Sequence, residues 1–288
     1  MQAGDLPEFE PFRAVLPHRG LDFSLENRSG VSTLWSMRIA VELVPKTFEH
    51  LQEELSYIQQ HLPRVDTINL PDLMRYDIRS WQACRPVQQI LPSNSAIPHF
   101  RSIDLNVKKP LPFADQLLES GVREVIVVTG DPPTDMSRKV YPTSCIDAIR
   151  KFKRELPEIK VYAGLDPYRS SLRSELEYLE RKQEAGAEGF FTQPYFDLRL
   201  MGVFQEMFEQ SECRDLPIFW GVTSVVGERS RRYWETRNRA IFPKDFQPTL
   251  DWNRAFVSQA LHWVEENRGN IYFMPIRVGI ADYLSGLL

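Results

Sequence analysis

The sequence predicts a single (β/α)8 TIM barrel preceded by an N-terminal arm. Three observations favour this fold class. From Arg38 on, short runs of β-forming residues alternate with longer amphipathic stretches, an alternation typical of βα units around a parallel sheet. The number of repeats matches the eight of this class, and a chain of 288 residues exceeds the roughly 250 that one barrel needs. We therefore expect an arm over residues 1–37, packed on a barrel over residues 38–288.

The strand that opens each repeat is a short run rich in apolar and β-branched residues. Such runs, bounded by Gly, Pro, Asn or Asp, are typical of strands in a buried parallel sheet. The predicted strands are Ile39–Val44, Thr67–Leu70, Ile97–Ser102, Glu124–Thr129, Lys160–Gly164, Gly189–Gln193, Ile218–Val222 and Ile271–Met274.

Between the strands, apolar residues recur three or four positions apart. This spacing predicts helices that pack one face on the sheet. The predicted helices are Phe48–His61, a short one near Pro86–Leu91, Phe113–Ser120, Thr143–Leu156, Leu172–Ala185, Leu198–Gln210, Glu228–Arg239, Leu250–Asn267 and a final turn or helix from Val278.

An open, doubly wound sheet is the alternative fold for the same alternation. A nucleotide-binding sheet of that kind would carry G-x-G-x-x-G after its first strand, and a P-loop would carry G-x-x-x-x-G-K-[ST]. The sequence has neither pattern. The barrel is therefore favoured, and a Rossmann or P-loop nucleotide site has no support.

Composition and charge exclude several function classes. The chain is 42% hydrophobic and 26% charged with a formal net charge of -4, which offers no electrostatic argument for binding nucleic acid or an anionic membrane. No apolar run approaches the roughly 18 residues of a membrane span, and the N-terminus has acidic residues and prolines where a signal peptide would be basic and then apolar. Cys84, Cys145 and Cys213 are widely separated and odd in number, which argues against a disulfide framework or a zinc site. We therefore expect a cytoplasmic protein with small-molecule ligands.

The barrel assignment predicts where a site would lie. Catalytic groups of such barrels sit at the C-terminal ends of the strands and in the loops that follow. The polar residues at or just beyond the predicted strand ends are Glu42, Asn69, His99, Asp131, Asp166, Gln193 and Thr223. We expect them to converge on one mouth.

Two carboxylates are the leading candidates for chemistry. Glu42 lies inside the apolar run VELVP, where an ionised carboxylate is costly unless it is paired or faces a cavity. Burial would raise its pKa and suit a proton donor at neutral pH, and an ion pair with an arginine on a neighbouring strand is an equal alternative. Asp131 follows Gly130, which lets backbone approach a ligand closely, and precedes two prolines that stiffen the loop. An Asx turn or a helix cap is the alternative for Asp131.

The other polar candidates are weaker one by one. A lone histidine such as His99 is more often a satisfied core residue than a ligand. Gln193 is neutral and suits reading the donor and acceptor edge of a heterocycle, while its aromatic neighbours could stack on a flat ligand or belong to the core. The charged face of the helix that carries Lys182 and Glu175 is expected to be solvated. The basic stretch 227–239 is typical of exposed surface, and it could also meet an anionic substrate tail or cofactor phosphates.

Five segments together resemble the methylenetetrahydrofolate reductase family. They are VELVPKT, IPHFRSID, VVTGDPP, LERKQEAGAEGFFTQPYFD and, more loosely, IFWGVTSV, and they occur in the family's order at similar spacing. The EAGAEGFFTQPYFD piece is the most specific of them. The resemblance implies a TIM barrel that holds FAD noncovalently at the strand ends.

The resemblance also implies residue roles. Glu42 matches the acid that helps protonate the bridged nitrogen of 5,10-methylenetetrahydrofolate, and Asp131 matches the aspartate that contacts the pterin and tunes charge near the flavin. Gln193 matches the glutamine that contacts folate and nicotinamide in turn, and Tyr195 is expected beside it at the substrate. The residues expected to contact the cofactor are Asn69, His99, Thr129, Gly130, Asp131, Tyr141, Tyr168 and Lys182.

The implied reaction transfers hydride from NADH or NADPH to FAD and from FAD to the tetrahydrofolate derivative. Its product, 5-methyltetrahydrofolate, serves methionine biosynthesis, and some one-carbon pathways run the step in reverse. The flavin supplies the difficult chemistry, and the protein supplies orientation and the proton. The sequence does not choose between the two nicotinamide donors. The N-terminal arm is the candidate interface of a homo-oligomer.

The chain departs from the family on the flavin side. It has ELVPK where members carry two aromatics, Thr129 where they have an arginine, and Gly164 and Tyr168 where they place an aromatic and a histidine. Each change removes or relocates a flavin contact. A flavin-independent reductase with direct hydride transfer and a non-catalytic folate-binding relative are therefore the alternatives.

Overall fold

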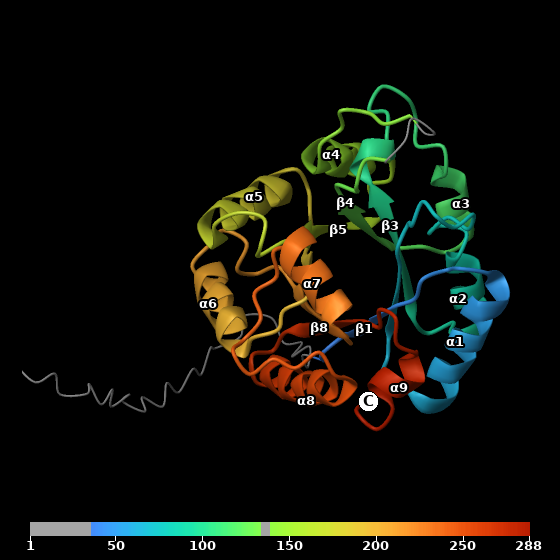
Figure 1. Ribbon diagram of the computed structural model, residues 1–288. Coiled ribbons are helices and arrows are strands. Elements are labelled where there is room, and N and C mark those ends of the chain that lie inside the picture. Colours follow the sequence, from blue (N-terminus) through green and yellow to red (C-terminus); the bar gives the residue numbers. More distant parts are fainter. Residues whose placement is uncertain (1–35, 134–138) are drawn as a thin grey trace, which may run out of the picture. The chain divides into compact units, whose positions relative to one another are not determined.

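A computed structural model describes residues 36–133 and 139–288. It contains eight strands that pair in chain order, each parallel to the next, and the last pairs with the first. The strands are β1 (Ile39–Glu42), β2 (Thr67–Leu70), β3 (Ser95–Arg101), β4 (Glu124–Val128), β5 (Lys160–Leu165), β6 (Phe190–Thr192), β7 (Ile218–Thr223) and β8 (Asn270–Met274). The sheet is thus a closed (β/α)8 barrel, as the sequence predicted (Figure 1).

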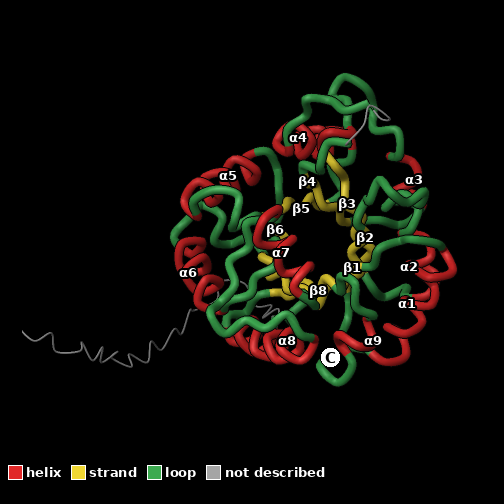
Figure 2. Tube along the Cα trace, viewed as in Figure 1, coloured by secondary structure: helices red, strands yellow, loops and turns green. Residues whose placement is uncertain are grey.

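Helices surround this ring of strands (Figure 2). They are α1 (Phe48–His61), α2 (Cys84–Ile90), α3 (Ala114–Glu119), α4 (Cys145–Glu155), α5 (Leu172–Glu184), α6 (Leu198–Glu209), α7 (Glu228–Arg237), α8 (Leu250–Glu266) and α9 (Ile280–Leu284). Within the described residues, none of these helices combines the length and apolar content that a bilayer span requires. The predicted arm over residues 1–37 lies almost wholly outside the described part and stays a prediction.

Local signals explain why the helices begin where they do. The side chain of Thr47 caps α1 by accepting a hydrogen bond from the His50 amide, and Ser144 and Ser171 cap α4 and α5 in the same way. In α1 the buried residues Leu51, Leu55 and Ile58 recur at helical spacing. Full burial of each such side chain contributes roughly 1.5–3 kcal/mol.

Four predicted strands extend one or two residues too far, at Val44, Ser102, Thr129 and Gln193. The backbone pairing does continue briefly, since the Gln193 amide donates to the Leu165 carbonyl at 2.7 Å. The chain then turns toward the next helix, so the apolar run is longer than the strand it forms.

Alternation along the strands divides the side chains into two layers. Outward-facing residues such as Val41, Ile68 and Phe273 join the core between the sheet and the helices. Inward-facing residues fill the barrel interior. There Phe191 and Phe219 stack at 4.0 Å, and Tyr162 and Tyr272 meet Phe191 edge-on at 5.3 and 5.2 Å. These four rings form an aromatic floor across the barrel.

Below the floor, at the N-terminal end of the strands, Arg38 closes the barrel. Its guanidinium donates to both carboxylate oxygens of Glu124 at 2.8 Å and to Thr67 Oγ1 at 2.8 Å. The Tyr162 hydroxyl donates to the same carboxylate at 2.8 Å. Burial alone would raise the pKa of Glu124, but the hydrogen bonds and charge of Arg38 outweigh it and hold that pKa below its usual value. Among the described residues, the buried polar side chains at this end of the barrel interior are therefore paired with one another, which favours the other end as the place for a ligand.

The three cysteines, Cys84, Cys145 and Cys213, are buried free thiols, as expected from their spacing.

Replacing Arg38 with methionine is expected to lower the free energy of unfolding by about 3 kcal/mol, because the Glu124 carboxylate would stay buried without a cation. Urea denaturation at pH 7 measures this loss. A depressed carboxyl pKa contributes stability that disappears as pH falls through it, so the difference from wild type should shrink below about pH 4. Adding Glu124→Gln should recover most of the loss, and an equal loss in the double variant would contradict the ion-pair explanation.

Candidate active site

Glu42 lies at the C-terminal end of β1 on the inner face of the barrel. Strand alternation directs Ala40 and Glu42 inward while Ile39 and Val41 face the outer core. The hydroxyl of Tyr272, on β8, donates a hydrogen bond to Glu42 Oε2. Burial raises the pKa of Glu42 to about 7, and the hydrogen bond from Tyr272 acts in the opposite direction. In the described part of the chain its partner is therefore a tyrosine and not an arginine, and the carboxyl can hold a proton near neutral pH.

Two polar residues stand beside Glu42 on the next strands. Asn69 of β2 is paired in register with Glu42, and its buried amide faces the Tyr272 hydroxyl. Neither polar atom of that amide has hydrogen-bond geometry to a described residue, and the same holds for His99 Nε2 on β3. Burial lowers the pKa of His99 to about 3, so its imidazole is neutral. Buried polar atoms almost always have partners, and these atoms are free to meet a ligand with a donor and acceptor edge.

The loop after β4 carries Thr129, Gly130 and Asp131. Gly130 has a φ of 79°, and a Cβ there would lie 2.6 Å from Arg101 Nε. Arg101 Nη2 also donates to the Asp131 carbonyl at 2.5 Å. Arg101 thus fills the space beside Gly130. The sequence had suggested that a ligand approaches the backbone closely there. Asp131 itself is exposed, and α4 is capped by Ser144.

Of the other residues expected along this loop, Thr129 is exposed and Tyr141 is partly exposed. Thr129 Oγ1 lies 3.3 Å from Cys145 Sγ. The Tyr141 amide donates to the Ile103 carbonyl at 2.7 Å, and Lys139 Nζ lies 5.3 Å from the centre of the Tyr141 ring.

Gln193 and Tyr195, two residues apart, point to different places. Gln193 is exposed just beyond β6, where it can meet a ligand. Tyr195 is 0% exposed and packs in the outer core, with ring centres 6.2 Å from Tyr168 and 5.4 Å from Trp220. Its side chain does not face the mouth, so its expected role beside the substrate gains no support from its position.

The expectation of a solvated charged face on α5 is wrong for Glu175 and Lys182, which are 1% and 2% exposed. Lys182 Nζ donates to the Gly164 carbonyl at 2.5 Å, lies 3.8 Å from Glu175 and sits 4.1 Å over the Tyr178 ring. Burial lowers the pKa of Lys182 to about 8, against the opposing effect of Glu175. These two charges can be buried because each has partners, which the helix pattern alone does not reveal.

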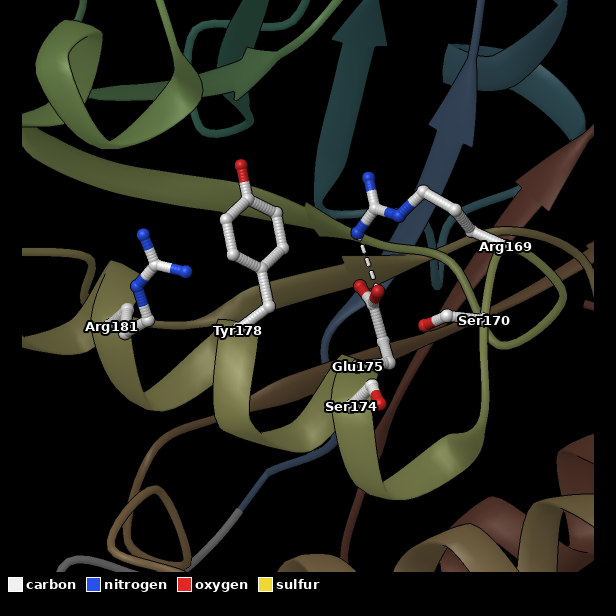
Figure 3. A pocket seen from close by; sticks show the side chains of 6 residues that line it. All are labelled: Arg169, Ser170, Ser174, Glu175, Tyr178 and Arg181. Atoms are coloured by element: carbon white, nitrogen blue, oxygen red, sulfur yellow. Dashed lines mark hydrogen bonds and ion pairs between the residues drawn. The ribbon is translucent and has the colours of Figure 1, made fainter.

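The first turn of α5 also borders a shallow pocket of about 360 Å³ (Figure 3). Glu175 there accepts a hydrogen bond from Arg169 at 2.5 Å and another from the Asp166 amide at 3.0 Å. The Tyr168 hydroxyl donates to the Pro194 carbonyl at 2.8 Å. Arg169, Lys182 and Tyr168 are therefore bound to other parts of the protein.

Two further strand-end residues have structural roles. Asp166 Oδ1 accepts from the Tyr168 amide at 3.0 Å, which forms an Asx turn. Thr223 Oγ1 donates to the Met274 carbonyl at 2.7 Å. Glu42, Asn69 and His99 come together on the inner face, while Asp131 and Gln193 are exposed at the ends of β4 and β6.

Sequence reasoning missed Tyr272 and Arg101. Both lie within predicted strands, at positions that alternation directs inward. The period-two pattern of a strand could have placed them in the barrel. It could not have named Glu42 or Gly130 as their partners.

The expected cofactor, FAD, needs hydrogen-bond partners for its ring and positive charge for its phosphates. Asn69 and His99 fit the first need, because their buried polar atoms lack partners in the described residues. The second need is met less well, since Lys182 and Tyr168 bind the protein itself and Arg101 fills the space beside Gly130. The mouth therefore fits the ring system of FAD. The side chains expected near the FAD phosphates contact other parts of the protein instead.

Comparison with known proteins points to one family. The family model described as methylenetetrahydrofolate reductase matches residues 81–253. The 5,10-methylenetetrahydrofolate reductase of Buchnera aphidicola subsp. Schizaphis graminum is 24% identical over 148 residues, which cover 51% of this chain and 50% of that protein. The enzyme of the same name from Escherichia coli is 26% identical over 104 residues, 36% of this chain and 35% of that protein. The match thus spans half or less of these curated relatives.

Solved structures share the fold at low identity. An uncharacterized protein from Clostridium thermocellum that binds two copies of 5-methyl-5,6,7,8-tetrahydrofolic acid has a TM-score of 0.57 at 12% identity, over 86% of this chain and 93% of that chain. A 2,3-dimethylmalate lyase has a TM-score of 0.51 at 12% identity, over 88% of this chain and 78% of that chain. The similarity to these structures shows the barrel alone.

Glu42→Gln is expected to change how stability depends on pH. Between the usual value of 4.5 and the raised value of about 7, the native carboxyl keeps a proton that the unfolded chain has released. Wild type should therefore lose about 1.4 kcal/mol of unfolding free energy per pH unit relative to the variant across this window, with no further change above it. Urea denaturation at several pH values tests this. A difference independent of pH would show that the pKa of Glu42 is not raised.

Proposed function

The chain belongs to the methylenetetrahydrofolate reductase family, and from that premise we propose that it reduces 5,10-methylenetetrahydrofolate to 5-methyltetrahydrofolate with hydride from NAD(P)H by way of FAD. The observation that carries the proposal is the Glu42 carboxyl, with a pKa raised to about 7, at a barrel mouth beside buried polar atoms that have no hydrogen-bond partner in residues 36–133 and 139–288. The solved relative that binds 5-methyltetrahydrofolate is consistent with a folate ligand. Reduced folates and NAD(P)H are cytoplasmic metabolites, and the product would supply methyl groups for methionine biosynthesis.

Glu42 is the proposed acid. Reduction begins when the bridged nitrogen of the substrate accepts a proton, because its bond to the methylene carbon then breaks and leaves an iminium carbon that can accept hydride. A group with a pKa near the working pH is the most effective proton donor. Tyr272 holds the Glu42 carboxyl in one orientation, and the aromatic floor beneath keeps water from below it.

The neighbouring residues orient the reactants. The neutral imidazole of His99 and the amide of Asn69 offer hydrogen bonds on the inner face. Gln193 and Asp131, exposed beyond β6 and β4, are proposed to contact the pterin, and Gln193 to contact the nicotinamide in turn. FAD, when bound, supplies the carrier that accepts hydride from the nicotinamide and returns it to the substrate.

Direct hydride transfer without flavin is the second candidate. It is favoured because groups expected to contact the flavin have partners within the protein. Lys182 and Tyr168 donate hydrogen bonds to backbone carbonyls, and Arg101 fills the space beside Gly130. In this version the same acid and the same mouth serve a nicotinamide placed directly against the folate.

The absorbance spectrum of the purified protein separates the two candidates. A flavoenzyme should be yellow, should bleach on anaerobic addition of NADH or NADPH, and should recover its colour with 5,10-methylenetetrahydrofolate. Whichever nucleotide bleaches it faster is the preferred donor. Folate-dependent NADH oxidation by a colourless protein to which added FAD makes no difference would favour direct transfer.

Glu42→Gln is expected to lower kcat for folate reduction by at least about 100-fold, the range of a lost acid catalyst, while the Kd for 5-methyltetrahydrofolate stays unchanged. Tyr272→Phe is the comparison variant: it keeps the acid and loses only the hydrogen bond that orients it, so its kcat should fall less than that of Glu42→Gln. The alkaline limb of its pH–rate profile should move to higher pH, because removing this hydrogen bond raises the pKa of Glu42 further. Full activity in Glu42→Gln with unaltered folate binding would rule out the acid assignment, and folate binding without reduction in wild type would favour a non-catalytic relative.

A further inference from the structure

Arg101, the last residue of β3, is a charged residue buried at the C-terminal end of the barrel. Strand alternation directs it toward the inner face, as it does Ile97 and His99, and the residue is 8% exposed. β4 runs beside it, with Arg101 in register with Val128 (Figure 1). Because a guanidinium keeps its charge in proteins, its burial here requires contacts that replace water.

Arg101 makes these contacts with the turn that follows β4. Its Nη2 donates to the Asp131 carbonyl at 2.5 Å. Its Cβ, Cγ and Nε line the space beside Gly130, where an added Cβ would lie 2.6 Å from Nε and 2.9 Å from the arginine Cβ. Gly130 has a φ of 79°, a left-handed conformation that glycine adopts without steric cost. Arg101 thus contacts both the glycine that makes the turn and the residue that follows it.

The short 3-10 helix η1 (Ser102–Asp104) holds the same turn from the β3 side. Asp104 Oδ2 lies 3.4 Å from Arg101 Nε, so a carboxylate orients the guanidinium. The Ile103 amide donates to the Thr129 carbonyl at 3.4 Å, and the Ile103 carbonyl accepts from the Tyr141 amide at 2.7 Å. Residues 101–104 and 129–131, here called the β3–β4 junction, are therefore joined by Arg101 and by the backbone.

The position of the Asp131 carboxylate depends on this junction. The residue is exposed, and within residues 36–133 and 139–288 its contact is the one that its carbonyl makes with Arg101. Its direction is therefore set by its backbone, which lies between Gly130 and Pro132 and is held by Arg101. A displacement of about 1 Å in a group that orients a substrate can be costly for the reaction.

We propose that Arg101 is a positioning residue, which holds the turn over residues 129–131 so that the Asp131 carboxylate meets the pterin ring. This inference rests on the proposed function, in which Asp131 contacts the pterin, and adds to it the group that holds this carboxylate in place. A hydrogen bond from a charged donor contributes more than a neutral one. Its loss is therefore expected to weaken folate binding about tenfold.

The test is a double-mutant cycle on the Kd of 5-methyltetrahydrofolate, measured by isothermal titration calorimetry. Arg101→Met removes the guanidinium and keeps an apolar stem, and Asp131→Asn removes the charge that is positioned. Each single variant should bind about tenfold more weakly than wild type. The double variant should bind no more weakly than Asp131→Asn alone, because residues that act as a unit do not have additive effects. Arg101→Lys keeps a charged donor and should lose less affinity than Arg101→Met.

Arg79→Met is the matched control, because Arg79 also binds the backbone of a loop beyond a strand end. Its Nη2 donates to the Leu73 and Tyr76 carbonyls at 3.1 and 2.7 Å, in the loop after β2 and not in the β3–β4 junction. Any effect of Arg79→Met on the Kd should be the same in wild type and in the Asp131→Asn background. Thermal denaturation shows whether each variant remains folded.

Hydrogen exchange tests the junction without a ligand. The amides of Ile103 and Tyr141 are hydrogen-bonded within or to the β3–β4 junction, so their exchange should be about tenfold faster in Arg101→Met, the factor that corresponds to one such hydrogen bond. Exchange in Asp131→Asn should match wild type, because the carboxylate does not hold the turn. Faster exchange in a protein that binds no folate would contradict the proposed function and leave the role of Arg101 in the turn intact.

Three results would overturn the inference. In the first, Arg101→Met weakens folate binding by the same factor with and without Asp131→Asn, which would mean that Arg101 acts independently of Asp131. In the second, Arg101→Lys loses as much affinity as Arg101→Met, so that a charged donor makes no difference. In the third, exchange of the Ile103 and Tyr141 amides is unchanged in Arg101→Met.

Discussion

The hydrogen bond from Tyr272 to Glu42 joins residues 230 positions apart and depends on closure of the barrel. Only because β8 pairs with β1 do the two side chains meet on the inner face. The contact holds in place a carboxyl group that burial would otherwise make still harder to ionise. The near-neutral pKa of Glu42 thus depends on the closed sheet. The barrel interior excludes water from below the carboxyl, and the Tyr272 hydroxyl supplies a hydrogen bond in place of water.

The polar groups inside the barrel differ along its axis in whether they have hydrogen-bond partners. At the N-terminal end, Arg38, Glu124 and Tyr162 satisfy one another. The aromatic floor above them contributes packing and no charge. At the C-terminal end, Asn69 and His99 present atoms without partners. Unpaired buried polar atoms are costly. Within the described part of the barrel interior they occur at this end and not at the other, which is the strongest physical argument that this end binds a ligand.

The substrate side and the cofactor side of the site also differ in whether their polar side chains are available to a ligand. Glu42, Gln193 and Asp131 remain available to a ligand, either on the inner face or exposed at strand ends. Lys182 and Arg101, by contrast, are bound to carbonyl groups of the protein. The family resemblance is therefore closest where a folate would lie.

The sequence alone determined the eight repeats and the element ends to within two residues, and it predicted a candidate site at the strand ends. These features follow from local rules: two-residue alternation in strands, apolar spacing in helices, and caps such as Thr47 and Ser171. Tertiary structure alone decided that Tyr272 meets Glu42, that Arg101 fills the space beside Gly130, that Lys182 and Glu175 are buried, and that Tyr195 faces the outer core. A local pattern sets the direction in which a side chain points. Which atom it meets there depends on sheet register and barrel closure, and these bring together residues far apart in the chain.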